Sequence, residues 1–68
     1  MTKTEAYKIA RARFGKPFVV AASVKGGRTY GFQERTERGI RTYQSGSYRD
    51  AVDARRDAIE RHVDRLMA

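Results

Sequence analysis

The stretch that decides the fold is KGGRTYGFQERTERGIRTY, residues 25–43. Within it, residues 28–35 alternate between aromatic side chains and small or polar ones, which is typical of a half-buried strand. Gly26 and Gly27 predict a two-residue hairpin turn before this strand, because glycine tolerates positive φ at little steric cost. A polar connection, TERG, leads to a short strand over residues 40–44. The stretch therefore predicts two antiparallel hairpins.

A strand and a helix are predicted before this stretch. Residues 17–24, PFVVAASV, are mostly apolar or β-branched and predict the first strand. Residues 2–14 predict a helix, with Thr2 or Thr4 as N-cap and Glu5 three residues after Thr2 in the capping-box arrangement. The apolar residues of this helix recur at helical spacing. They are Ala6, Ile9, Ala10 and Phe14, with Tyr7 beside them. We expect Gly15 to end the helix, since glycine commonly follows a helix C-terminus.

A long helix is predicted over residues 47–66. Ser47 is its expected N-cap, and the helix dipole favours Asp50 in the first turn. The apolar residues fall on one stripe, which is the expected core face. They are Tyr48, Val52, Ile59, Val63 and Leu66. We therefore expect residues 1–68 to form a single α+β domain of order αβββα, with a three-stranded antiparallel sheet packed on the long C-terminal helix.

The composition excludes several kinds of site. The 68 residues include no cysteine and one histidine, which rules out disulfides and argues against a zinc site. That histidine, His62, is expected to be half-buried at the edge of the core. No group of residues has the arrangement of a catalytic site, so we expect a non-enzyme without metal or cofactor. Residues 18–22 form the longest apolar run and are too few to span a membrane, and the N-terminus lacks the apolar segment of a secretory signal. A cytoplasmic protein is expected.

The charge is strongly positive and unevenly distributed. The net charge is +7, and the pI is about 10.4. Residues 1–16 carry a net charge of +4, residues 17–46 carry +3, and residues 47–68 carry none. The excess therefore belongs to the first helix and the sheet, and it favours a polyanionic partner, of which nucleic acid is the commonest.

The cations of the sheet have two interpretations. Lysine and arginine on edge strands can simply prevent edge-to-edge association. Alternatively, one sheet face packs on the C-terminal helix while the other presents arginines, whose planar fork suits phosphates and guanine edges. The expected nucleic-acid-binding residues are Lys16, Lys25, Arg28, Arg35, Arg38 and Arg41. The aromatic side chains Tyr30, Phe32, Tyr43 and Tyr48 are expected in the core rather than as stacking platforms.

Five carboxylates of the C-terminal helix are spaced so that they share one helical face. They are Asp50, Asp53, Asp57, Glu60 and Asp64. A solvated face interlaced with arginines is the favoured interpretation. The alternatives are a partner-binding ridge, a ridge that pairs with the basic first helix, and a contact between two copies in a homodimer. Arg11 and Arg13 of the first helix are further possible partner-binding residues.

The sequence GSYRDAVDARRDAI, residues 46–59, follows a strand ending in RTY. In this respect the chain resembles the three-strands-plus-helix DNA-binding domains of the AP2 and integrase arm-binding types. The resemblance implies that the sheet enters the DNA major groove. The residues that would then contact DNA are Lys25, Arg28, Arg35 and Arg41. The tryptophan usual in AP2 strands is absent here, and a basic helix precedes the sheet.

The order αβββα is also similar to that of double-stranded-RNA-binding domains. In those domains a lysine cluster at the start of the last helix binds phosphates. Asp50 and Asp53 stand at that place in this chain, which argues against duplex RNA.

These observations favour a small basic nucleic-acid-binding protein of a phage or other mobile element, with DNA expected rather than RNA. The affinity of such a protein falls steeply with salt. The alternative is a phage-encoded anti-CRISPR or other anti-defence inhibitor that binds a host protein or nucleoprotein complex. An inhibitor of this kind would bind its target with limited salt sensitivity.

Overall fold

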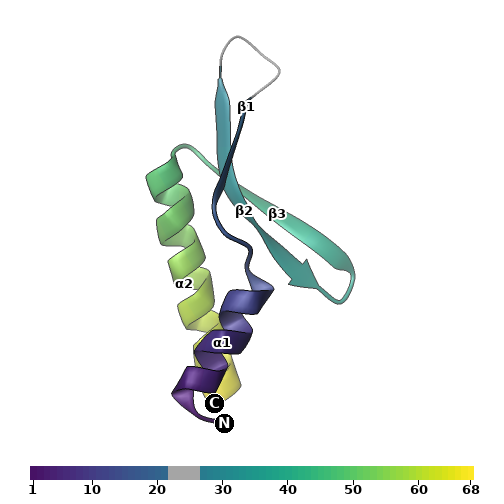
Figure 1. Cartoon of the computed structure of the whole chain (residues 1–68), viewed down its shortest axis with the longest axis vertical. Coiled ribbons are helices and arrows are strands. Elements are labelled where there is room, and N and C mark those ends of the chain that lie inside the picture. The colour runs from purple at the N-terminus through teal and green to yellow at the C-terminus, as the bar shows by residue number, and fades with distance from the viewer. Residues whose placement is uncertain (22–26) are drawn as a thin grey trace.

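The computed structural model describes residues 1–21 and 27–68 and has the expected order of elements (Figure 1). The elements are α1 (Lys3–Arg13), β1 (Phe18–Ala21), β2 (Arg28–Thr36), β3 (Gly39–Ser45) and α2 (Tyr48–Met67). The strands form one antiparallel sheet in the order β1-β2-β3. The predicted α+β fold of order αβββα is thus confirmed. The predicted Gly26–Gly27 turn, residues 22–24 of the first predicted strand and Lys25 lie outside the described residues.

Both helices begin at the predicted N-caps. Thr2 Oγ1 accepts a hydrogen bond from the backbone N–H of Glu5 at 3.2 Å, and Glu5 Oε1 accepts one from the N–H of Thr2 at 3.3 Å, which completes the capping box. Ser47 Oγ accepts a hydrogen bond from the N–H of Asp50 at 3.1 Å. Each cap satisfies an N–H that has no partner within the helix.

The end of α1 differs from the prediction. Gly15 is not in the left-handed conformation of a glycine cap, and Gly39 is the glycine with positive φ among the described residues. The helix ends because the backbone of Phe14 is extended, with φ −107° and ψ 115°. Phe14 forms an isolated antiparallel β-bridge with Glu34 of β2. The N–H of Gly15 then donates to the carbonyl oxygen of Gln33 at 2.7 Å. The chain leaves α1 by joining the sheet.

The connection between β2 and β3 is shorter than predicted. Thr36 and Gly39, expected in the polar connection, form the last pair of the hairpin, so two residues remain in the turn. Gly39 has φ 125°, a conformation that favours glycine. Thr36 Oγ1 donates to the carbonyl oxygen of Gly39 at 2.9 Å and supports the turn.

The core lies where α1, α2 and β2 meet. Its buried side chains are Ala6, Ala10, Phe14, Phe32, Ile59 and Val63. The rings of Phe14 and Phe32 meet edge to face, with their centroids 6.2 Å apart. The ring of the half-buried His62 also packs edge to face on Phe14, with a centroid distance of 6.1 Å. Small alanines on α1 allow it to lie close against the C-terminal half of α2, and both chain termini lie at that end (Figure 1).

Two residues of the predicted apolar stripes are exposed. Ile9 is 44% exposed and Tyr48 is 48% exposed. The face of α1 that meets α2 carries Ala6 and Ala10, which leaves Ile9 beside the contact. The molecule measures 47 × 25 × 14 Å, and so thin a body leaves little interior for further apolar residues.

Candidate nucleic-acid interface

Four cations line one groove near the end of α1. This basic groove has a volume of about 490 Å³ and lies between the end of α1, the segment after it, and β2 and β3. Its cationic residues are Arg11, Lys16, Arg35 and Arg55. The remaining lining residues are Ala12, Phe14, Gly15, Gln33 and Ile40, so no carboxylate lines the groove among the described residues. Such a surface attracts anions, because its positive field is not neutralised locally.

The junction between α1 and the sheet brings these cations together. The pairing of Phe14 with Glu34, and the hydrogen bond from Gly15 to Gln33, hold the segment after α1 against β2. This places Lys16 in the same groove as Arg35. Both residues were predicted to bind nucleic acid, and the structure brings them together.

Arg55 has a structural role at the same place. Its Nε donates to the carbonyl oxygen of Gly15 at 2.7 Å, and its Nη2 donates to that of Phe14 at 3.0 Å. The guanidinium therefore caps carbonyl groups at the end of α1, where the helix dipole also favours a cation. Sequence analysis did not predict Arg55 at the site, because these contacts span 40 and 41 positions and carry no local signal.

The cations of the basic groove form no ion pair with a described carboxylate. Within residues 1–21 and 27–68 there are two such pairs, Arg13–Glu34 at 2.6 Å and Arg56–Asp53 at 3.9 Å. Arg11, Lys16 and Arg35 are therefore not in ion pairs with any described carboxylate. Their charges are available to an anionic ligand.

Glu34 is a buried carboxylate, 6% exposed, on the other side of this junction. It accepts hydrogen bonds from Arg13 Nε at 2.6 Å and from the Tyr43 hydroxyl at 2.9 Å. Burial alone would raise its pKa, but these hydrogen bonds and the charges of Arg13 and Arg41 outweigh burial and hold the pKa below its ordinary value of 4.5. The carboxylate is therefore ionised and organises the side chains around it.

The predicted cations do not share one sheet face, so that part of the prediction is wrong. Residues paired directly across a sheet lie on the same face. Phe32 is opposite Tyr43 and Glu34 is opposite Arg41, which places Arg41 on the side that packs against α2. Arg28 alternates in phase with Phe32 and so belongs to that side as well. Arg35, paired with Ile40, lies on the opposite face.

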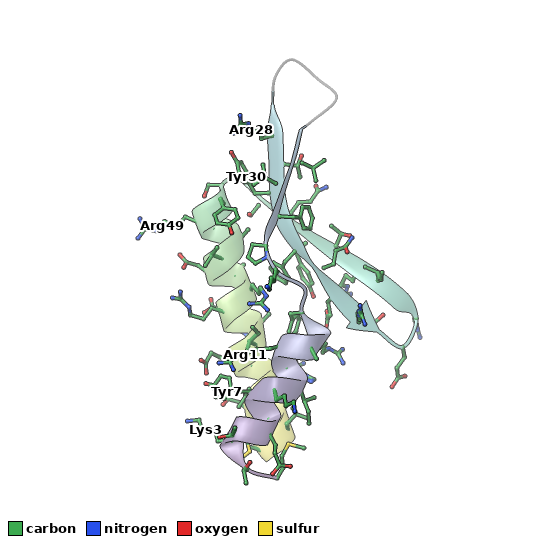
Figure 2. All side chains as sticks on the ribbon, in the orientation of Figure 1. Lys3, Tyr7, Arg11, Arg28, Tyr30 and Arg49 are labelled. Atoms are coloured by element: carbon green, nitrogen blue, oxygen red, sulfur yellow. The ribbon has the colours of Figure 1, made fainter. Side chains whose placement is uncertain are left out.

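The remaining predicted cations lie at two ends of β2. Arg38 is in the β2–β3 turn, in a surface depression that Arg13 and Arg41 also line and that shares Ile40 with the basic groove. Arg28 is the first residue of β2 and Thr36 is the last. At the rise per residue of an extended strand, these two residues are about 26 Å apart. Figure 2 shows it far from Arg11, near the other end of the molecule. The depression at the β2–β3 turn therefore adjoins the basic groove, whereas Arg28 lies far from both.

The acidic residues of α2 are all exposed and share one face, as predicted. At about 100° per residue, the centre of this face lies about 120° around the helix from the buried Ile59 and Val63. One of its members links the helices, since the Tyr7 hydroxyl donates to Glu60 Oε2 at 2.6 Å. This bond to a carboxylate raises the pKa of Tyr7 above 10. Among the described residues no cation of α1 forms an ion pair with this face, so the alternative of a ridge paired with the basic first helix is reduced to this one tyrosine–carboxylate hydrogen bond.

No protein-family model, curated protein or solved structure matches this chain. Within the described ranges, no three or more His, Cys, Asp or Glu side chains are grouped closely enough to hold a metal ion. In those same ranges no helix combines the length and the apolar character needed to cross a membrane.

Proposed function

We propose that this chain binds nucleic acid through its phosphates, which lie in the basic groove. The observation that carries the proposal is the gathering of Arg11, Lys16, Arg35 and Arg55 in one groove without a carboxylate. Arginine suits this role because its planar guanidinium binds two phosphate oxygens at once.

The surface beside the groove supports an extended anionic ligand. Ile40 lines both the groove and the depression at the β2–β3 turn, where Arg38 lies exposed and three arginines outnumber the one carboxylate, Glu37. A phosphodiester backbone could therefore pass from Lys16 across Arg35 to Arg38. We propose DNA as the ligand, and the experiment below compares it with RNA.

Fluorescence anisotropy with labelled duplex DNA, single-stranded DNA and duplex RNA tests the proposal, at salt concentrations from about 50 to 300 mM. We expect micromolar or tighter binding at low salt and a steep loss of affinity as salt rises, because each phosphate contact releases condensed counterions. Tighter binding of RNA than of DNA would change the ligand class but keep the groove.

A charge-matched pair of variants locates the site. Lys16→Gln with Arg35→Gln removes two charges from the groove, whereas Lys8→Gln with Arg28→Gln removes two exposed charges outside it. We expect the first variant to weaken binding more and to reduce the salt slope by about 1.4 to 1.8, as for two lost phosphate contacts. Equal effects would mean that the overall charge, not the groove, attracts the ligand.

Absence of binding to all three nucleic acids at low salt would overturn the proposal. The positive surface would then face an acidic protein, as expected of an anti-defence inhibitor, and affinity capture from a host would be the next experiment.

A further inference from the structure

A second groove runs between α1 and α2. It has a volume of about 420 Å³, within the range of about 300–1,000 Å³ typical of small-ligand sites. Val52 and Ile59 contribute apolar surface to it, and Tyr7 and Tyr48 contribute aromatic rings. We call it the interhelical groove. It shares Arg11 and Arg55 with the basic groove, so one ligand can reach both.

Tyr48 offers an aromatic ring to a ligand. Tyr48 is 48% exposed, and it is the first residue of α2, directly after the cap formed by Ser47. The aromatic pairs among the described residues are Phe14–Phe32, Phe14–His62 and Phe32–Tyr43, so Tyr48 stacks on no described ring. Its backbone is held by the helix while part of its surface faces solvent.

Tyr7 is arranged differently. The guanidinium of Arg11 lies over its ring at 5.3 Å, and its hydroxyl donates to Glu60. Figure 2 shows Lys3, Tyr7 and Arg11 following one another along α1, and the last two of these line the groove. Tyr7 therefore positions Arg11 and Glu60, and Tyr48 is the ring open to a ligand.

The interhelical groove is lined by three arginines, Arg11, Arg55 and Arg56, and by one carboxylate, Glu60, so its fit to a nucleobase rests on its apolar and aromatic side chains rather than on its charge. The carboxylate of Glu60 can accept a hydrogen bond from the amino group of cytosine. Apolar side chains and a tyrosine ring suit the face of a base. The basic groove beside it has four cations and no carboxylate among its described lining residues.

We propose that the interhelical groove receives an unpaired nucleobase, stacked on Tyr48, from a single strand whose phosphates lie in the basic groove. This inference rests on the proposed function and makes it more specific, because bases inside a duplex are not available for stacking on a side chain. The chain should therefore bind single strands more tightly than duplexes.

The test compares three labelled probes under identical conditions. They are an oligo(dC) strand of about 15 nucleotides, a duplex of the same length, and polyphosphate, which has phosphates but no bases. The variants are Tyr48→Leu, which keeps apolar bulk but loses the ring, and Tyr48→Phe, which keeps the ring. Circular dichroism checks that both variants fold.

We expect Tyr48→Leu to weaken binding of oligo(dC) by roughly fivefold to more than tenfold, the effect of losing one stacked base. Binding of polyphosphate should not change, and Tyr48→Phe should bind oligo(dC) as the original chain does. The chain has four tyrosines and no tryptophan, so base stacking should also quench its tyrosine emission. This quenching should be smaller in Tyr48→Phe, which binds equally well.

Two failures are distinguishable. If polyphosphate and duplex bind but oligo(dC) binds no more tightly than the duplex, or Tyr48→Leu leaves its affinity unchanged, the base-binding inference is overturned and the proposed function stands. If none of the three probes binds, the proposed function fails and the inference fails with it.

Discussion

The guanidinium of Arg55 lies against the end of α1, with Nη2 3.0 Å from the carbonyl oxygen of Phe14. The two residues are 41 positions apart, so this contact ties the middle of α2 to the point where α1 gives way to the sheet. The same junction places Lys16 beside Arg35 in the basic groove. The stability of the fold and the shape of the groove therefore depend on the same contact.

Replacing Arg55 should destabilise the protein. We expect Arg55→Leu to lower the free energy of unfolding by about 1–3 kcal/mol, because it leaves the partly buried carbonyl group of Phe14, and the exposed one of Gly15, without this donor. Arg55→Lys should recover only part of the loss, since an ammonium lacks the planar fork. Urea unfolding followed by circular dichroism measures the change. The neighbouring, exposed Arg56 is the control, and Arg56→Leu should change stability by less than about 0.5 kcal/mol. Equal effects would contradict this role of Arg55.

Gly31 should not tolerate a side chain. A Cβ atom at this position would lie 2.0 Å from the backbone carbonyl oxygen of Tyr43, so the backbone of β2 or β3 would have to move. We expect Gly31→Ala to cost about 1–3 kcal/mol or more in the free energy of unfolding. At Gly46 the nearest atom is Asp50 Oδ2 at 3.9 Å, and Gly46→Ala should be neutral or slightly stabilising. Thermal unfolding of both variants checks the difference, and similar melting temperatures would refute it.

Acid should destabilise the fold through Glu34. Its pKa is below 4.5 in the folded state, so the ionised carboxylate contributes stability above pH 4.5 that is lost as the pH falls through the folded-state value. Glu34→Gln should remove this part of the acid sensitivity and cost about 1–3 kcal/mol at pH 7, since the charge-assisted hydrogen bond from Arg13 is weakened. Glu37→Gln, in the exposed turn, is the matched control. Unfolding curves recorded from neutral to acid pH would disprove the prediction if the two variants behaved alike.

His62 should make stability depend on pH in a higher window. Burial, then the charges of Arg13 and Arg65, lower its pKa below 6.5 despite the opposing charge of Glu34. The unfolded chain therefore takes up a proton first as the pH falls below 6.5, and stability decreases from that point. Above pH 6.5 the effect is absent. In His62→Leu, the urea midpoint should stay constant just below pH 6.5 where that of the original chain falls. A midpoint that falls equally in both would exclude His62 as the cause.

The sequence was a good guide wherever a signal was local. Ser47 was predicted as a cap and Thr2 as one of two candidates, because each cap involves a side chain and a backbone N–H three positions away. The five elements followed from apolar periodicity and from the glycines and polar residues between them. The exposure of Ile9 and Tyr48 was not predicted, since helical spacing allows more than one buried face. The packing of α2 against α1 buries Ala6 and Ala10 instead.

The sequence by itself determined the order of the elements, the helix caps and the concentration of positive charge before α2, because these depend on neighbouring residues and composition. Tertiary structure alone decided which cations lie in the same groove. The bridge between Phe14 and Glu34 brings Lys16 beside Arg35, while the alternation of β2 sends Arg28 to the other side of the sheet. Strand register and helix packing join residues far apart in the chain, and such contacts leave no local pattern by which a sequence could reveal them.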